Sequence, residues 1–399
     1  MKILIWDKDT RLLNTGGPSG YLYNIHEYLK NNSSDEVYFY SDIIEKDNTS
    51  KENIIKEDNW ISKIFFRHSS LKFIYTLFSV FFRSKKLNPT EIKLINRFDY
   101  VHFHWLSEVL KYHRSLEKTN AKIILTTHTP EPLIDEVIHN SGKKLYILQS
   151  NLIRNIFIKR EIKAFEYVDY IMFPSKYSSE VYTNVSILYK KAFVKLNKKF
   201  FYVPTAITDI STEKKYSKFI KNKIDDLNVC YIGRHNEIKG YDKLKKIAIE
   251  VWKEISNIHF YIGGKEGPLY GLDDFRWHEL GWVNTYDLLH DIDVFILPNK
   301  ETYYDLILLE VLKSGKPVIL TRTGGNKQFI DYVPNTGLFY YDYDDINSAV
   351  EQIKKVFKLK NEGYLDKIGH DNFILFKKTS CQSVYMKNYI EKIKLLEYR

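Results

Sequence analysis

Short apolar runs rich in Ile, Val, Phe and Tyr recur along the chain, separated by stretches long enough to form helices. Nearly continuous apolar runs of this length are typical of parallel strands that are covered on both faces. The intervening lengths suit crossover helices, so the pattern predicts an α/β fold. The predicted strands are 2–6, 37–41, 100–104, 122–127, 170–174, 200–203, 228–233, 258–263, 294–298 and 317–321.

The apolar runs form two groups, which the polar, lysine-rich stretch 209–226 separates. We therefore predict an N-terminal domain at 1–208, a linker at 209–226 and a C-terminal domain at 227–378. The length of 399 residues agrees with two or three domains. Apolar residues in 379–399 have near-helical spacing, which predicts a terminal helix that packs back on the first domain.

Composition excludes several classes of protein. A hydrophobic fraction of 44% excludes a wholly disordered or low-complexity chain. The two cysteines, Cys230 and Cys381, cannot form a disulfide-stapled scaffold or a four-cysteine zinc site. The first apolar run is too short for a signal peptide, and no apolar stretch approaches the ~20 residues needed to cross a bilayer. We therefore predict a soluble or peripheral cytoplasmic protein.

The chain is basic, with a formal net charge of +10. Such a surplus favours an anionic partner: nucleic acid, a phosphate-bearing substrate or the inner face of a membrane. The basic residues are scattered rather than gathered in one tail. An equally good interpretation is that lysine is simply the preferred solvated residue of this chain.

Three loops after predicted strands carry residues suited to an anionic or hydroxylated ligand. A glycine turn at 16–20 opens a helical pattern, where free backbone N–H groups suit a phosphate, although a plain turn is an equal alternative. The segment 233–240 places an arginine and a lysine at the carboxyl end of a strand. The loop 298–305 leads into a helical pattern in which Glu310 lies among leucines. That carboxylate needs a partner, either a ligand hydroxyl or a structural lysine or arginine.

These segments, in this order, resemble the GT-B glycosyltransferases of family 4, the glycosyl transferases group 1 type. The matching segments are 16–17, 99–104, 126–128, 203–207, 231–240, 280–282, 293–298 and 310–319. The resemblance covers most of the chain, and its second half is the specific part. It implies two Rossmann-like domains with parallel sheets facing a central cleft, with a nucleotide sugar held mainly by the second domain. It also implies a retaining, metal-independent transfer in which two basic residues neutralise charge on the leaving diphosphate.

The resemblance further implies roles for individual residues. Arg234 and Lys239 clamp the donor diphosphate, and Gly17 approaches it from the other domain. Glu310 matches the carboxylate that binds the nucleotide ribose, and His128 matches a histidine that orients or polarises the transferring sugar. The predicted catalytic residues are His128, Arg234 and Lys239, and the predicted donor-binding residues are Gly17, Gly233, Arg234, Lys239, Glu301, Thr302, Tyr304 and Glu310.

The chain departs from the family pattern in its acidic motif. The family usually has two acidic residues eight positions apart, with Phe-Gly two and three positions after the first. Counting back from Glu310, the first position is Thr302; Glu301 comes one residue early, and Tyr304-Asp305 replaces Phe-Gly. The contacts to the sugar hydroxyls, and with them the donor sugar, therefore stay open.

No metal or other cofactor is expected. Asp-x-Asp sequences at 7–9, 291–293 and 342–344 imitate the metal site of the other glycosyltransferase fold. The first lies on the wrong strand for that site, the second at a strand entry and the third in an acidic turn. His102 and His104 alternate on a strand and so face the same way, which makes them candidates for the acceptor side. A core or rim histidine is the alternative for at least one of them.

The segment 60–86 combines aromatic residues with flanking basic charges. It suits insertion into the headgroup region of an anionic leaflet. The candidate membrane contacts are Phe78, Phe81, Phe82, Arg83, Lys85 and Lys86. The alternative is a helix pair packed on the sheet of the first domain.

The sequence therefore predicts a hexosyl- or deoxyhexosyltransferase that moves a sugar from a nucleotide sugar to a saccharide acceptor. We expect a lipid-linked acceptor, a role in bacterial capsule, exopolysaccharide or glycoconjugate synthesis, contact with the inner face of the plasma membrane, and no nucleic acid partner. The alternative is a non-catalytic GT-B-like partner or targeting subunit of an active glycosyltransferase. The altered acidic motif favours that alternative, and so does the loop after Val203, where Pro204-Thr205-Ala206 stands in place of the Pro-Asn-Gly expected from the family. The residues that oppose it are His128, Arg234, Lys239 and Glu310.

Overall fold

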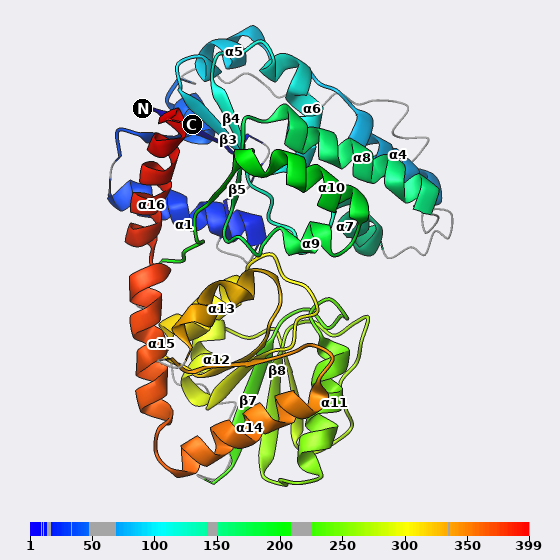
Figure 1. Cartoon of the computed structure of the whole chain (residues 1–399), viewed down its shortest axis with the longest axis vertical. Coiled ribbons are helices and arrows are strands. Elements are labelled where there is room, and N and C mark those ends of the chain that lie inside the picture. The colour runs from blue at the N-terminus through cyan, green and yellow to red at the C-terminus, as the bar shows by residue number, and fades with distance from the viewer. Residues whose placement is uncertain are drawn as a thin grey trace. The chain divides into compact units, whose positions relative to one another are not determined.

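The computed structural model describes residues 1–398 apart from 9, 11, 14–16, 33, 48–68, 142–150, 209–224 and 334–335. The chain divides into two compact units (Figure 1). The first unit comprises Met1–Phe173, Val181–Val203 and Tyr389–Arg399, and the second comprises Pro174–Glu180 and Pro204–Asn388. Most of the predicted linker, Gly16 and the start of the 60–86 segment lie outside the described residues.

The first unit contains a parallel six-stranded sheet in the order β2-β1-β3-β4-β5-β6. Its strands are β1 (Ile3–Trp6), β2 (Val37–Phe39), β3 (Tyr100–Phe103), β4 (Lys122–Leu125), β5 (Tyr170–Phe173) and β6 (Phe200–Tyr202). β1 pairs with both β2 and β3, so the chain order reverses there. Loops that leave the two strands at such a point diverge, and a crevice opens at their carboxyl ends.

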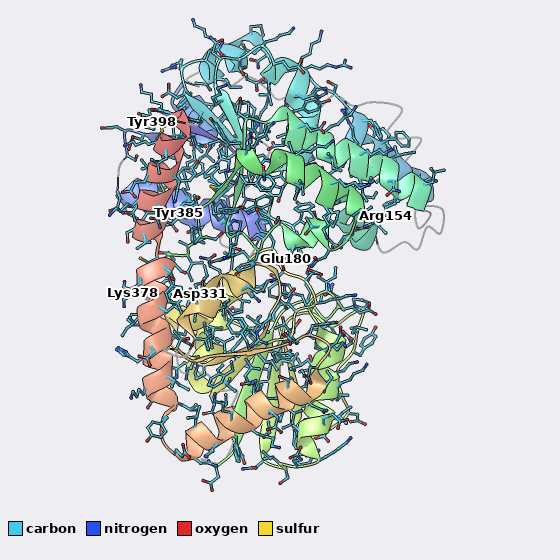
Figure 2. All side chains as sticks on the ribbon, viewed as in Figure 1. Arg154, Glu180, Asp331, Lys378, Tyr385 and Tyr398 are labelled. Atoms are coloured by element: carbon cyan, nitrogen blue, oxygen red, sulfur yellow. The ribbon has the colours of Figure 1, made fainter. Side chains whose placement is uncertain are left out.

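Helices connect these strands. They are α1 (Gly17–Asn31), α2 (Tyr40–Asp47), α4 (Ser69–Phe82), α5 (Pro89–Ile95), α6 (Leu106–Leu116), α7 (Leu133–Ser141), α8 (Asn151–Tyr167), α9 (Glu180–Thr183) and α10 (Ile187–Leu196), followed by the short turn η2 (Asn197–Lys199). α6 packs between the sheet and helices α4 and α8. Arg154 lies on α8 (Figure 2). It forms an ion pair with Asp135 on α7, with 2.5 Å between Nη2 and Oδ2. This pair joins two neighbouring helices of the first unit.

α4 buries one face and exposes another. Phe81 is fully buried, with its ring 5.0 Å from the ring of Phe157 on α8. The prediction that Phe81 contacts a membrane is therefore wrong, because its ring packs between α4 and α8. Phe78 and Phe82 remain 55% and 42% exposed.

The second unit contains another parallel six-stranded sheet, in the order β12-β11-β10-β7-β8-β9. Its strands are β7 (Leu227–Ile232), β8 (Ile258–Gly263), β9 (Trp277–Gly281), β10 (Val294–Leu297), β11 (Val318–Thr321) and β12 (Leu338–Tyr341). The predicted central strands are confirmed. The two edge strands, β9 and β12, were not predicted.

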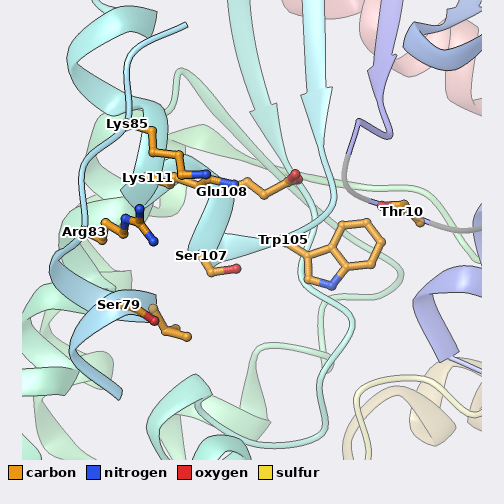
Figure 3. A pocket seen from close by; sticks show the side chains of 9 residues that line it. Thr10, Ser79, Arg83, Lys85, Trp105, Ser107, Glu108 and Lys111 are labelled. Atoms are coloured by element: carbon orange, nitrogen blue, oxygen red, sulfur yellow. The ribbon is translucent and has the colours of Figure 1, made fainter. Parts of the chain in front are cut away.

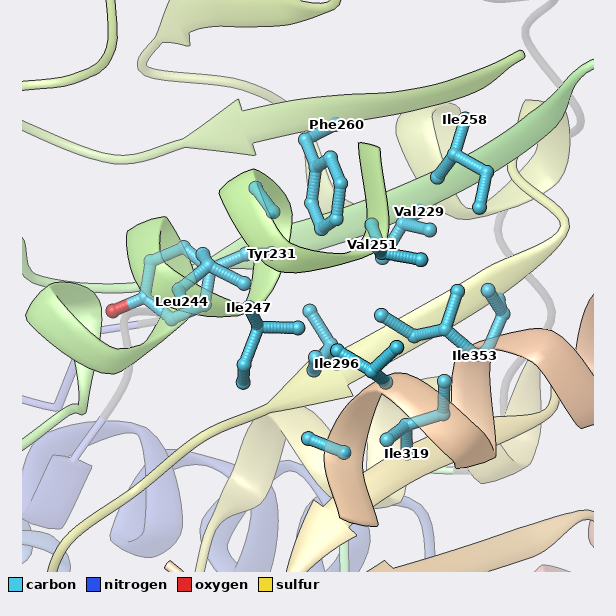
Figure 4. Close-up of a cluster of buried hydrophobic side chains, with 14 of the residues drawn as sticks. Val229, Tyr231, Leu244, Ile247, Val251, Ile258, Phe260, Ile296, Ile319 and Ile353 are labelled. Atoms are coloured by element: carbon cyan, nitrogen blue, oxygen red, sulfur yellow. The ribbon is translucent and has the colours of Figure 1, made fainter. Parts of the chain in front are cut away.

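Helices cover both faces of this sheet. They are α11 (Tyr241–Trp252), α12 (Thr285–Asp291), α13 (Leu306–Lys313), α14 (Ile346–Asn361) and α15 (Leu365–Thr379), with the turn η3 (Gly324–Tyr332). Successive residues of β7 point to opposite faces: Val229 packs with α11 and α14, and Cys230 packs with α12, α13 and α15. Figure 4 shows the first of these two clusters. Fully burying a side chain such as Val229 contributes about 1.5–3 kcal/mol, so both layers stabilise the sheet.

The end of the chain, α16 (Gln382–Lys394) and the turn η4 (Leu395–Tyr398), contributes residues to the first unit. The Tyr170 hydroxyl on β5 donates to the carbonyl of Leu396 at 3.2 Å. Lys394 forms an ion pair with Glu36, which precedes β2. Residues from the far end of the chain therefore form part of the first unit.

One glycine of the second unit tests this architecture. Gly240 has a left-handed φ of 69°, and a Cβ at this position would lie 1.6 Å from the carbonyl oxygen of Pro298. We expect Gly240→Ala to lower the free energy of unfolding by more than about 3 kcal/mol, because backbone strain and a backbone clash act together. Urea unfolding followed by circular dichroism measures this.

Gly363 is the matched control. Its φ is 77°, but a Cβ there would meet nothing within 4 Å. Gly363→Ala should cost only the strain of about 1–2 kcal/mol. Equal losses in the two variants would contradict the close approach of Gly240 to Pro298.

Candidate functional site

The loops that leave β7, β10 and β11 meet at the carboxyl edge of the second sheet. β7 lies between β10 and β8, so the chain order reverses at this point. The backbone N–H of Lys300 donates to the carbonyl of Ile238 at 2.9 Å, and the Thr323 hydroxyl donates to the carbonyl of Lys300 at 3.0 Å. The structure thus brings the 233–240 and 298–305 loops together where ligands bind in open α/β sheets.

The 233–240 loop presents an arginine with an available side chain. The Tyr231 hydroxyl donates to the carbonyl of Arg234 at 2.8 Å, and this contact fixes the backbone of the loop. Gly233 lies against the same ring, because a Cβ there would be 2.8 Å from the Tyr231 hydroxyl oxygen. The Arg234 guanidinium is exposed and forms no ion pair with any residue in the described part of the chain. Its planar set of donors is therefore available to an anion.

Lys239 already has a carboxylate partner. Its Nζ lies 2.6 Å from Oδ1 of Asp305, which is only 5% exposed. The other oxygen, Oδ2, accepts hydrogen bonds from the side-chain amides of Asn299 and Asn326, the latter at 3.1 Å. One buried carboxylate therefore joins the loops that follow β7, β10 and β11.

Sequence reasoning noted Asp305 only as a substitution in the acidic motif. An aspartate directly before a helix usually caps that helix through its side chain. Asp305 stands at this position before α13, but its side chain forms no capping hydrogen bond. Its partner Lys239 lies 66 positions away along the chain, so no local pattern identifies the pair.

Glu310 lies on α13 and faces the start of α12. It is half-buried, and burial raises the pKa of its carboxyl to about 7, opposed by the charge of Lys313 and a hydrogen bond from Thr285. Burial and the Glu310 charge together raise the pKa of Tyr286 on α12. The Thr285 hydroxyl is therefore one of the partners of the Glu310 carboxylate.

The other residues of the predicted acidic motif occupy the same loop as Asp305. Thr302 is buried, and its carbonyl accepts a hydrogen bond from the N–H of Gly325 at 3.2 Å. Glu301 and Tyr304 are half-buried, and burial raises the pKa of Tyr304. Contact of these three residues with a donor stays a prediction.

Three histidines gather at the carboxyl ends of β3 and β4 in the first unit. His102 is fully buried, and its ring nitrogens bond to the Tyr389 hydroxyl at 2.8 Å and to the Thr126 hydroxyl at 2.7 Å. His102 is therefore a core histidine, which corrects the prediction that it contacts the acceptor. Nδ1 of His104 bonds to Nε2 of His128 at 3.0 Å.

These histidines are neutral at ordinary pH. Burial lowers the pKa of His128 to about 3, and burial with the two neighbouring rings lowers the pKa of His104. Nε2 of His104 is buried and has no hydrogen-bond partner among the described residues. His128 can therefore act through hydrogen bonds rather than through a positive charge.

A small cavity of about 80 Å³ adjoins His104 and His128. Thr127, Trp105 and the fully buried Glu161 also line it. One oxygen of Glu161 accepts from the N–H of Leu133 at 3.0 Å, and burial raises the pKa of this carboxyl to about 8. Glu161 is thus a neutral acid at pH 7, and sequence reasoning did not identify it because it lies inside a helical pattern.

Gly17 opens α1 with a φ of 78°, and a Cβ there would meet nothing within 4 Å. Pro18, the next residue, lines the cavity beside His128. The start of α1 therefore exposes open backbone next to the histidines.

Neither a metal cluster nor a membrane-spanning helix is found among the described residues. No group of three or more His, Cys, Asp or Glu side chains there is placed to hold a metal ion. No helix in the same part of the chain is long and apolar enough to cross a membrane. The role of metal in the reaction stays a prediction.

Comparison with known proteins agrees with this geometry. Residues 226–358 match the family model of the glycosyl transferases group 1. This stretch contains Arg234, Lys239, Asp305 and Glu310. No curated protein sequence matches the chain significantly.

Several solved structures resemble the whole chain. Sucrose-phosphate synthase from Thermosynechococcus elongatus has a TM-score of 0.61 and 12% identity, with 100% of each chain covered. Anabaena HepE in complex with UDP has a TM-score of 0.59 and 11% identity, over 99% of this chain and 100% of that one. A glycosyltransferase from Rickettsia africae has a TM-score of 0.58 and 13% identity, over 98% and 97%.

Likeness at such low identity shows the fold, and the predicted fold class is thereby confirmed. The chain has the GT-B fold, and its residues 226–358 match the family model of the glycosyl transferases group 1.

Proposed function

We propose that the chain is a glycosyltransferase that takes a sugar from a nucleotide sugar bound to the second unit. The observation that carries this proposal is the exposed Arg234 guanidinium, without an ion-pair partner among the described residues, at the point where the second sheet reverses its strand order. It lies within the stretch that matches the group 1 family. HepE, which shares the fold, has been solved with UDP and with UDP-glucose, and this supports a nucleotide-sugar donor.

The chemistry follows from where charge develops. When the bond between the anomeric carbon and the diphosphate oxygen breaks, its electron pair passes to the diphosphate. Arg234 and Lys239 stabilise that charge, Gly233 offers close backbone approach, and Glu310 accepts from the ribose hydroxyls. In a retaining transfer the acceptor hydroxyl attacks from the face that the diphosphate leaves, so a diphosphate oxygen takes the hydroxyl proton. No step of this scheme requires a metal ion.

The acceptor is proposed to bind the first unit, beside His104 and His128. The cavity there is lined by two neutral histidines and by Glu161, a neutral acid at pH 7. Uncharged donors and acceptors of this kind suit the hydroxyl groups of a saccharide. His128 is proposed to hydrogen-bond a sugar hydroxyl there.

The finer proposals concern the pathway and the membrane. We propose that the chain is a hexosyl- or deoxyhexosyltransferase of bacterial surface polysaccharide synthesis. We also propose that it contacts an anionic leaflet. Phe78 and Phe82 are exposed on α4, and Arg83, Lys85 and Lys86 directly after it are exposed as well. An apolar surface beside basic charges suits an interfacial position.

A second candidate function is that of a non-catalytic partner of an active glycosyltransferase. The observation that favours it is the pairing of Lys239 with Asp305, because a lysine already neutralised stabilises a departing diphosphate less well. Nucleotide binding alone does not separate the two functions. Release of UDP from UDP-glucose, over a background without enzyme, supports the catalytic function, and its absence with every UDP-, GDP- and dTDP-sugar supports the second.

The first prediction concerns Arg234. Arg234→Ala should weaken UDP binding by about ten- to a hundredfold, because a hydrogen bond to a charged group is worth about 1.5–3 kcal/mol. Titration calorimetry measures this. Arg97→Ala, an exposed arginine before β3, is the control and should bind UDP like the wild type. Unchanged affinity in Arg234→Ala would refute the clamp.

The second prediction concerns the carboxylate that joins the loops. Asp305→Ala should lower the free energy of unfolding by about 3 kcal/mol, since it leaves Lys239 and two buried amides without their partner. Adding Lys239→Met should restore part of this loss, because the two effects are coupled. Asp344→Ala, which removes the exposed partner of Lys243, should change stability little. Additive losses at Lys239 and Asp305 in urea unfolding would refute the coupling.

The third prediction concerns pH. Glu310 is a neutral acid below its pKa of about 7 and a carboxylate above it. UDP binding should therefore weaken about tenfold as pH falls from 8 to 6, because a charged acceptor is replaced by a neutral one. Glu310→Gln should bind weakly at pH 8 and lose this dependence. The exposed Glu362→Gln should keep the wild-type profile, and a wild-type profile in Glu310→Gln would refute the ribose contact.

A further inference from the structure

The first unit contains a second cavity, of about 320 Å³, which is larger than the one beside His104 and His128. Figure 3 shows it, with Arg83 and Lys85 on one side, Trp105 on the other and Ser107 between them. Thr10 also lines it. We name this cavity the basic pocket; its lining includes Thr10, Ser79, Arg83, Lys85, Trp105, Ser107, Glu108 and Lys111.

The basic pocket lies where the topology of the first sheet favours a ligand. Thr10 follows β1 and Trp105 follows β3, and the chain order of the sheet reverses between these two strands. Crevices at such reversals are the usual binding places of open α/β sheets. A volume of about 320 Å³ is at the lower end of the range for small-molecule sites.

Its charge favours an anion. Arg83, Lys85 and Lys111 bring three positive charges against the single carboxylate of Glu108. The backbone N–H of Lys85 donates to the carbonyl of Lys111 at 2.8 Å, which fixes the segment after α4 against α6. The basic side chains therefore come from two elements that are held together.

The start of α6 adds to this preference. Ser107 and Lys111 are four residues apart on α6 and so share one face of the helix. Trp105, at the N-cap, provides no side-chain hydrogen bond to the helix. The positive end of the helix dipole and a serine hydroxyl therefore meet the basic side chains, a combination that suits phosphate oxygens.

The surfaces on either side of the basic pocket indicate which kind of molecule the bound phosphate belongs to. Trp105 and Ser107 line both this pocket and the small cavity beside His104 and His128. On its other side, Ser79 of α4 lines the pocket, and α4 exposes Phe78 and Phe82 with their rings 5.4 Å apart. The small cavity proposed to bind the acceptor sugar, a cationic pocket and an apolar surface thus follow one another.

We propose that the basic pocket binds the phosphate that joins the acceptor sugar to a lipid. The acceptor is then a sugar phosphate ester of a long-chain alcohol, with its sugar beside His128, its phosphate on Arg83 and Lys111, and its hydrocarbon chain along α4. This inference rests on the proposed function, because it takes the first unit as the acceptor side. A phospholipid headgroup shares the phosphate chemistry, and the experiment separates the two sources.

The test compares direct binding in two double variants. Arg83→Gln with Lys111→Met removes two charges of the pocket while keeping most of the side-chain volume. Arg114→Gln with Lys118→Met removes two exposed charges at the other end of α6 and beyond it, and serves as the control. Circular dichroism melting confirms that both proteins are folded, and Arg83→Gln alone replaces the double variant if it is not.

The probes are glucose 1-phosphate, glucose, farnesyl phosphate and vesicles of phosphatidylcholine with or without phosphatidylglycerol. We expect the wild type and the control to bind glucose 1-phosphate and farnesyl phosphate in calorimetry, and to bind glucose much more weakly. The pocket variant should lose at least tenfold in affinity for both phosphates. Its sedimentation with phosphatidylglycerol vesicles should fall only slightly, because Lys85, Lys86 and the exposed phenylalanines remain.

Two outcomes overturn the proposal. Equal affinity of the pocket variant and the wild type for both phosphates shows that the pocket does not bind phosphate. Loss of vesicle binding without loss of glucose 1-phosphate binding shows that the pocket takes a lipid headgroup instead. UDP affinity, measured on the same proteins, should be unchanged by the pocket substitutions. A wild type that binds farnesyl phosphate but not UDP would refute the donor assignment while leaving the basic pocket in place.

Discussion

The buried carboxylate of Asp305 is the contact on which the proposed donor site depends. It accepts from Lys239, Asn299 and Asn326, and so joins the loops that follow β7, β10 and β11. Parallel strands bring these loops to one edge of the sheet, but they do not determine the loop conformations. A charged, largely buried pair whose two carboxylate oxygens both accept hydrogen bonds supplies that order, and it also restrains the lysine proposed to meet the diphosphate.

Two cavities of different character meet at the start of α6 in the first unit: the small cavity beside His104 and His128, and the basic pocket. Burial keeps His104 and His128 neutral and holds Glu161 protonated at pH 7, so these three side chains of the small cavity offer hydrogen bonds without charge. The basic pocket next to it keeps its charges at the rim, where Arg83 and Lys85 are exposed. Desolvation therefore separates the surface proposed to bind hydroxyl groups from the surface proposed to bind phosphate.

Much of the fold was predictable because a strand covered on both faces must be apolar along its length. That rule identified β7, β8, β10 and β11, whose residues alternate between two helix layers. It failed at the sheet edge for β9, where His278 and Glu279 are half-exposed and break the apolar run. Phe81 was wrongly assigned to a membrane contact, because an aromatic run has the same sequence pattern whether it faces lipid or packs against another helix.

The sequence by itself determined the strand pattern, the loops that carry Arg234, Lys239 and Glu310, and the side chains available there. Only the tertiary structure decided how those side chains pair and ionise. His102 is satisfied by Tyr389, which is 287 positions away, and Lys239 is paired with Asp305, which is 66 positions away. Local patterns record which face of an element is buried, whereas pairing and pKa depend on the neighbours that the fold brings from elsewhere in the chain.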